Sequence, residues 1–198
     1  MLIFLAVNII AQKLNLSFFM LLTQGFGNAI IRRKGGPMKY IVMVDQGDSV
    51  AEFYAESLKQ ILIDLSVKHG VRGCWLDTEV KFFDSVDNAW DFINEHATEV
   101  IGVITEVMML PGRLFPNFDD TEGGMKTGLR FYEMLWQRFP LLQVIFLTYL
   151  DLDWDWLETL VDGFQCIALQ KYDTPPFDFA ESAIRFFRLA PEAVSAAA

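Results

Sequence analysis

Cysteine and histidine are scarce in this chain of 198 residues. There are two cysteines, Cys74 and Cys166, and two histidines, His69 and His96. Two cysteines that form no CxxC pair cannot build a disulfide framework, so we expect two reduced, mostly buried thiols in a cytoplasmic protein. The histidines are too few and too scattered for a zinc centre. The sequence thus excludes a disulfide scaffold and predicts no zinc chemistry.

Positive charge is also scarce beyond the N-terminal segment. The first 37 residues carry a charge of +4 and no acid, whereas the other 12 basic and 26 acidic residues give −14. An acidic surface repels phosphate backbones, so we expect no nucleic-acid binding. With 53% hydrophobic and 21% charged residues, the chain suits a packed core, and its length fits one domain plus an extension.

Residues 1–37 form an apolar N-terminal extension. A single charge, Lys13, lies within residues 1–31, and the basic run 32–34 follows. The uncharged run 14–31 is at the lower length limit of a membrane span, but several polar residues dilute its apolarity. Three interpretations stay open: a weak membrane anchor, an amphipathic extension that packs on a partner, or sequence upstream of a true start at Met38. Membrane contact is expected only if 1–31 is an anchor.

After a Gly-Gly-Pro break at 35–37, apolar runs alternate with amphipathic stretches. The first helix begins at Asp48 or Ser49 and the second at Asp84 or Ser85, both suitable N-caps. The first helix has apolar side chains at helical spacing, at 50, 53, 54, 58, 61, 62 and 65. Further helices are predicted at 127–139, 154–164 and 177–189, and strands at 40–44, 80–83, 100–105, 142–147 and 166–169.

This alternation predicts an α/β fold, a three-layer α/β/α sandwich with a five-stranded parallel sheet, over residues 38–190. The tail 191–198 has nothing to bury and is expected to be disordered. In open parallel sheets the functional crevice lies outside the carboxyl ends of the strands. Asp45, Glu106, Thr148 and Lys171 each follow a predicted strand closely, so we expect the function at these four residues.

The sequence around these positions resembles the receiver domains of response regulators. IVMVDQGDSV is similar to their first strand and acidic turn, and VITEVMMLPG to the third strand with its phosphoacceptor. VIFLT and IALQK end at the hydroxyl residue and the lysine, and EGGMKTGLRFYEML resembles a subgroup with an extended loop before helix three. The resemblance implies a flavodoxin-like receiver topology and two-component phosphorelay signalling. The implied partner is a protein, a histidine kinase or an output protein.

In such receivers two adjacent acids and the phosphoacceptor aspartate bind Mg²⁺, and the hydroxyl and the lysine hold the phosphate. The resemblance assigns Asp45 to the first acid, whereas Gln46 replaces the second and Glu106 takes the place of the phosphoacceptor. Because Mg²⁺ prefers carboxylate oxygens, metal binding by Asp45 and Glu106 is expected to be weak if it occurs at all, and no other cofactor is implied. Glu106 is one methylene too long for the geometry of phosphoryl transfer.

The negative charge of Glu106 has two open interpretations. It imitates a permanently phosphorylated state beside Thr148 and Lys171, or it forms a structural salt bridge with Lys171. A shift of one residue in the alignment would put Val107 at the acceptor position instead. Tyr149 stands where receivers have a small residue, and we expect it to cover the pocket.

Alternating acids at Asp151, Asp153 and Asp155 favour a helix cap, with Trp154 and Trp156 at an interface or in the core. The leading hypothesis is a pseudo-receiver that acts through protein contacts and is not an enzyme. One alternative is a working but atypical phosphoacceptor receiver. A further alternative is a metal-dependent phosphoryl-transfer enzyme that uses the three aspartates.

Overall fold

The computed structural model describes residues 38–46, 49–69, 77–150 and 165–189. The chain divides into two units, Met1–Gly36 and Pro37–Ala198, and every described residue lies in the second. The predictions for 1–37 and for the tail 191–198 lie outside the described residues. Within the described ranges, no helix combines the length and the apolarity that crossing a membrane requires.

Five parallel strands form one sheet, as the sequence predicted. They lie in the order β2-β1-β3-β4-β5, and each neighbouring pair is parallel. The strands are β1 Lys39–Val44, β2 Thr78–Phe83, β3 Val100–Thr105, β4 Gln143–Thr148 and β5 Cys166–Gln170. The order reverses between β1 and β3, which is the topological switch point where open α/β sheets bind ligands. The flavodoxin-like topology is therefore confirmed.

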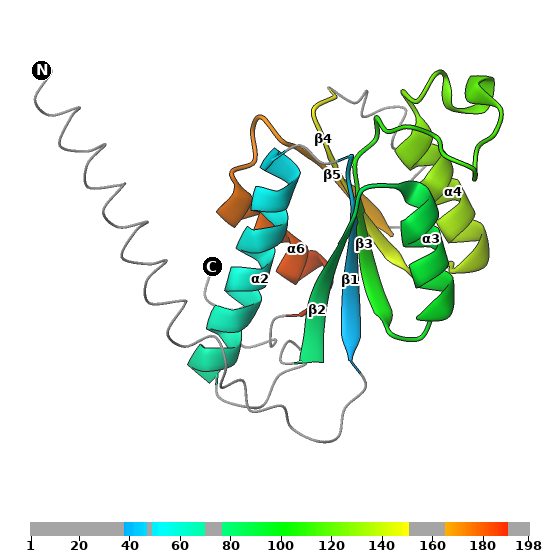
Figure 1. The fold of residues 1–198 in the computed structure, drawn as a ribbon. Helices are drawn as coiled ribbons and strands as arrows, with labels where there is room; N and C mark the ends of the chain where they lie inside the picture. The colour runs from blue at the N-terminus through cyan, green and yellow to red at the C-terminus, as the bar shows by residue number, and fades with distance from the viewer. Residues whose placement is uncertain (1–37, 47–48, 70–76, 151–164, 190–198) are drawn as a thin grey trace, which may run out of the picture. The chain divides into compact units, whose positions relative to one another are not determined.

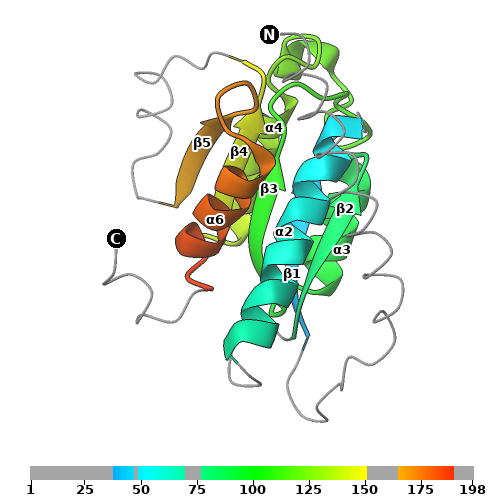
Figure 2. The same cartoon turned by 90° about the vertical axis from the view of Figure 1, so that its left-hand side faces the viewer.

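Helices cover both faces of the sheet (Figures 1 and 2). The helices α2 Ser49–His69 and α6 Pro176–Phe186 lie on one face, and α3 Val86–Glu95 and α4 Thr127–Arg138 lie on the other. A short 3-10 helix, η2 Phe118–Thr121, lies in the long loop between β3 and α4. The helix predicted at 154–164 lies outside the described residues. These layers confirm the predicted three-layer sandwich.

The core lies in two apolar layers, one on each side of the sheet. Along β1, Ile41 and Met43 pack on the α2 and α6 side, and Val42 and Val44 pack on the α3 and α4 side. All four side chains are almost completely buried. Since a central parallel strand is covered on both faces, it has no polar face, which explains the uncharged runs in the sequence.

The apolar face of α2 differs from the predicted one at its first turn. Tyr54, Leu58 and Leu62 pack into the core, as expected from their spacing. Val50 and Phe53 are exposed instead, Phe53 by 59%. Because the face that meets the sheet is centred on Tyr54 and Leu58, these two earlier residues turn toward solvent.

Candidate functional site

The residues just beyond the strands are fixed by main-chain hydrogen bonds that continue the sheet. The N–H groups of Asp45 and Glu106 each donate to the last carbonyl of a neighbouring strand, at 3.0 Å. The N–H of Lys171 donates to the carbonyl of Thr148 at 2.8 Å. The main chain therefore holds these side chains at the carboxyl edge of the sheet, beside the switch point.

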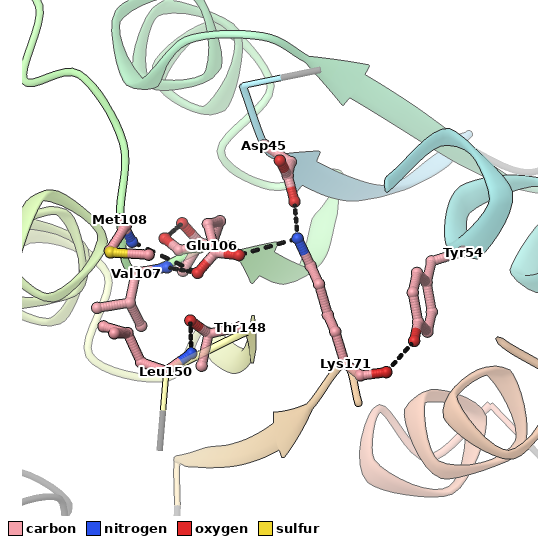
Figure 3. Close-up of polar contacts among 9 residues, drawn as sticks. Asp45, Tyr54, Glu106, Val107, Met108, Thr148, Leu150 and Lys171 are labelled. Atoms are coloured by element: carbon pink, nitrogen blue, oxygen red, sulfur yellow. Dashed lines mark hydrogen bonds and ion pairs between the residues drawn. The ribbon is translucent and has the colours of Figure 1, made fainter. Parts of the chain in front are cut away.

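Asp45, Glu106 and Lys171 form one buried cluster, which we call the carboxylate–lysine site (Figure 3). The Nζ atom of Lys171 lies 2.7 Å from Oδ2 of Asp45 and 2.8 Å from Oε2 of Glu106. The side chain of Lys171 is only 1% exposed. One ammonium between two carboxylates leaves a formal charge of −1 at this site.

The charge of Lys171 is set by two opposing effects. Burial lowers the pKa of the amine, because it disfavours the charged form. The hydrogen bonds and the negative charges of Asp45 and Glu106 outweigh this effect and raise the pKa above its ordinary value. Lys171 is therefore an ammonium at neutral pH.

The second oxygen of Glu106 is bound by the main chain. Its Oε1 atom accepts hydrogen bonds from the N–H groups of Val107 at 2.7 Å and of Met108 at 3.4 Å. The side chain of Val107 is fully buried in the apolar layer beside α3 and α4. Of the two possible registers, the structure thus places Glu106, and not Val107, against Lys171.

The first turn of α4 packs closely on the main chain that follows Glu106. The N–H of Gly128 donates to the carbonyl of Val107 at 2.9 Å, and Oγ1 of Thr127 donates to the carbonyl of Met109 at 2.5 Å. A Cβ atom on Gly128 would lie 2.0 Å from the carbonyl oxygen of Glu106. This position therefore requires glycine, because only glycine lets the helix approach the loop so closely.

Thr148 ends β4 and Tyr149 follows it, and their side chains make different contacts. The hydroxyl oxygen of Thr148 accepts a hydrogen bond from the N–H of Leu150 at 3.2 Å, and the described residues show no hydrogen bond between it and Glu106. The aromatic ring of Tyr149 lies 4.6 Å from Nζ of Lys171 and 4.9 Å from the ring of Tyr172. Tyr149 is half-buried, so its ring covers the ammonium from one side.

Solved receiver domains share this fold. The receiver domain of the response regulator NarL from Mycobacterium tuberculosis is 14% identical, with 77% of this chain and 98% of that chain covered and a TM-score of 0.50. The fold is that of a response-regulator receiver domain. A receiver domain from Clostridium thermocellum has 16% identity, 76% and 95% coverage and a TM-score of 0.48. No protein-family model and no curated protein sequence matches this chain.

The receiver fold does not bring every predicted residue to the site. Gln46 follows Asp45 directly but is exposed to solvent, whereas Asp45, Glu106 and Lys171 are buried. Trp154 and Trp156 lie outside the described residues, as do the three aspartates at 151, 153 and 155. Their predicted roles at an interface, at a helix cap or in metal binding stay predictions.

The Mg²⁺ ion of the receiver resemblance would have to be held at this site by the carboxylates of Asp45 and Glu106. The ammonium of Lys171 already binds both Asp45 and Glu106, and a dication would have to displace this buried charge. Among the described residues, no three histidine, cysteine, aspartate or glutamate side chains gather closely enough to hold a metal. A second acid at position 46 would add a hard oxygen ligand, but Gln46 provides only a neutral amide.

One residue at the site was missed by the sequence analysis. The hydroxyl of Tyr54, on α2, donates to the carbonyl oxygens of Lys171 at 2.9 Å and of Thr174 at 2.7 Å. In the sequence Tyr54 belongs to an apolar helical face, and nothing there indicates which carbonyl its hydroxyl reaches. The two partners lie more than a hundred residues away along the chain.

Proposed function

We propose that this receiver domain is a signalling module that acts through protein–protein contacts and is not phosphorylated in the ordinary way. The observation that carries the proposal is the position of the Glu106 carboxylate. It occupies a small anion site made of the Lys171 ammonium and the N–H groups of Val107 and Met108. A cation and successive main-chain N–H groups are the donors that bind phosphoryl oxygens. Glu106 thus supplies permanently the negative charge that a phosphoryl group would bring.

The same contacts disfavour a reaction at Glu106. Phosphoryl transfer depends on exact positioning of the nucleophile and on cations that offset the growing charge. Both oxygens of Glu106 are already bound, one by Lys171 and the other by main-chain N–H groups. The exposed Gln46 adds no charge for a metal ion. Attack on a phosphodonor would first require breaking these buried contacts.

Exposed apolar side chains near the site support a protein partner. Most of the large apolar side chains that are exposed among the described residues lie at the carboxyl edge of the sheet or in the first two turns of a helix that begins there. They are Val50, Phe53, Met108, Leu110, Phe118, Met125, Tyr172 and Phe177. A protein partner that docks at this edge would remove these side chains from water, which favours association. We propose a kinase or an output protein as the partner, and no nucleic acid, because the described domain is strongly acidic.

Incubation with Mg²⁺ and acetyl phosphate tests the proposal. We expect intact-mass measurement to show no phosphoryl group on the wild-type protein. The double variant Gln46→Asp/Glu106→Asp restores both acids and is expected to gain one base-labile phosphoryl group. Glu106→Asp alone is the matched control, since it shortens the side chain without adding the second acid, and we expect it to react more slowly. Stoichiometric labelling of wild-type Glu106 would overturn the proposal.

A working phosphoacceptor receiver is the second candidate. It is favoured by the presence of Asp45, Thr148 and Lys171 at the ends of their strands. This candidate predicts Mg²⁺ binding that Asp45→Ala abolishes, measured by calorimetry with the metal alone. The first candidate predicts no measurable binding in either protein.

A further inference from the structure

Tyr54 connects helix α2 to the loop that follows β5. The residue is almost completely buried, and the carbonyl oxygens of Lys171 and Thr174 share the single proton of its hydroxyl. Its ring packs edge-on against Phe179 of α6, with 5.2 Å between ring centroids. A single hydroxyl therefore joins α2, which follows β1, to the turn from which α6 begins (Figure 3).

The main chain at Lys171 is held from two sides. On one side its N–H donates to the carbonyl of Thr148 on β4, and on the other its carbonyl accepts from Tyr54. The turn is closed by the N–H of Thr174, which donates to the carbonyl of Gln170 at 3.0 Å. The side chain of Lys171 starts from this fixed main chain and ends between Asp45 and Glu106.

We infer that Tyr54 is a positioning residue of the carboxylate–lysine site: its hydroxyl fixes the turn 171–174, so that the ammonium of Lys171 reaches both carboxylates. The inference rests on the proposed function, because it says how the permanently charged state of that site is held and connected to α2 and α6. Removing the hydroxyl leaves two carbonyl groups without this donor, and a buried acceptor that loses its donor is costly.

A change in the turn 171–174 also affects Tyr149, whose ring covers the ammonium of Lys171. Tyr172 lies within the turn, and its ring contacts the ring of Tyr149. Tyr149 in turn covers the ammonium of Lys171. A turn that is no longer held by Tyr54 therefore exposes Lys171 and shifts its aromatic cover at the same time.

Chemical labelling of Lys171 tests the role of Tyr54. Wild-type protein, Tyr54→Phe and Tyr132→Phe are treated with an amine-acylating reagent under native conditions, and modification is measured by peptide mass spectrometry. Tyr54→Phe keeps the ring that packs on Phe179 and removes only the hydroxyl. Tyr132→Phe removes the same atom from a buried tyrosine on the opposite face of the sheet, where it packs on Phe146.

We expect the labelling rate of Lys171 to rise on the order of tenfold in Tyr54→Phe, as the loss of a buried hydrogen bond implies. In wild type and in Tyr132→Phe, Lys171 stays protected. The partly exposed Lys59 reports on the reagent and is expected to react equally in all three proteins. An unchanged rate in Tyr54→Phe, or an equal rise in Tyr132→Phe, would overturn the inference.

A second variant covers the case in which Tyr54→Phe fails to fold. Phe179→Leu removes the ring contact but keeps the hydroxyl of Tyr54, so Lys171 is expected to stay protected. Rapid labelling of Lys171 in folded Phe179→Leu would show that packing, and not the hydroxyl, positions the lysine. Acylation involves no phosphoryl transfer, so a phosphorylated wild type would overturn the proposed function and leave this inference standing.

Discussion

The side chain of Lys171 is the cation that two buried carboxylates share. We expect Lys171→Met to lower the free energy of unfolding by about 3–5 kcal/mol, because it leaves Asp45 and Glu106 buried beside each other without a cation. Urea denaturation monitored by fluorescence or circular dichroism measures the loss. A change of less than about 1 kcal/mol would contradict a buried, charge-compensated site.

The substitution Glu106→Gln is expected to cost less than Lys171→Met. The amide oxygen of glutamine still accepts from main-chain N–H groups or from Lys171, and Asp45 still offsets the ammonium. We expect a loss of about 1.5–3 kcal/mol, the range for a hydrogen bond to a charged group, in the same urea denaturation. If Glu106→Gln lowered the free energy of unfolding as much as Lys171→Met, the site would not consist of one ammonium paired with two carboxylates.

At the scale of single residues, the sequence predicted where charges lie better than how hydroxyl and amide groups are oriented. Asp45, Glu106 and Lys171 meet because parallel strands end at one edge, and this follows from the strand pattern alone. The hydroxyl of Thr148 accepts from Leu150, and Gln46 is exposed. Such local choices depend on nearby donors and on turn geometry, which no strand pattern specifies.

At the scale of elements, the main chain of the long loop between β3 and α4 is bound to α3 through the side chain of Asp87. The carboxylate of Asp87 accepts hydrogen bonds from the N–H groups of Arg113 at 2.8 Å and of Leu114 at 3.0 Å. The preceding Gly112 has a φ of +63°, and a Cβ there would lie 2.7 Å from the carboxylate. Asp87 therefore fixes the position of a loop that exposes apolar side chains.

We expect Asp87→Ala to increase amide hydrogen exchange in residues 112–116, since it removes the acceptor of two main-chain donors. The expected loss of global stability is only about 1–2 kcal/mol, because the loop is mostly exposed. Asp91→Ala is the matched control. It removes an exposed partner of the Arg113 side chain but leaves the main-chain bonds, so exchange in the loop should stay as in wild type.

The sequence predicted the elements well and their local details less well. The strands were predictable because a parallel strand that is buried on both faces is a nearly continuous apolar run in the sequence. The contacts of the loop between β3 and α4 were not predicted, because its hydrogen bonds with Asp87 join residues more than twenty positions apart. The exposed Phe53 shows a similar limit, since helical spacing does not say which side of an apolar stripe meets the sheet.

At the scale of the whole molecule, three buried groups make the fold sensitive to alkali. Burial raises the pKa of Cys166 from 9.0 to about 11, although a hydrogen bond with Tyr132 opposes the rise. Burial, together with the nearby Cys166, raises the pKa of Tyr132 from 10.0 to about 12. The pKa of Lys171 is also raised, since its two carboxylates outweigh the effect of burial.

All three shifts act in the same direction. The folded protein keeps each proton to a higher pH than the unfolded chain does, so the stabilisation is complete below about pH 9 and declines as the pH rises through the folded pKa values. For Cys166 alone the decline is about 2 kcal/mol by pH 11. We expect the free energy of unfolding in urea to fall steadily between about pH 9 and about pH 11.

The variant Cys166→Ala separates this contribution from the others, because alanine has no proton to lose. We expect its free energy of unfolding to fall less steeply over the same pH range, with Lys171 and Tyr132 accounting for the remaining slope. At pH 7 the variant loses the sulfur volume in the apolar layer and the hydrogen bond with Tyr132, and this loss is the same at every pH below about 9. If both proteins lost stability equally between about pH 9 and about pH 11, ionisation of the buried thiol would not be linked to unfolding.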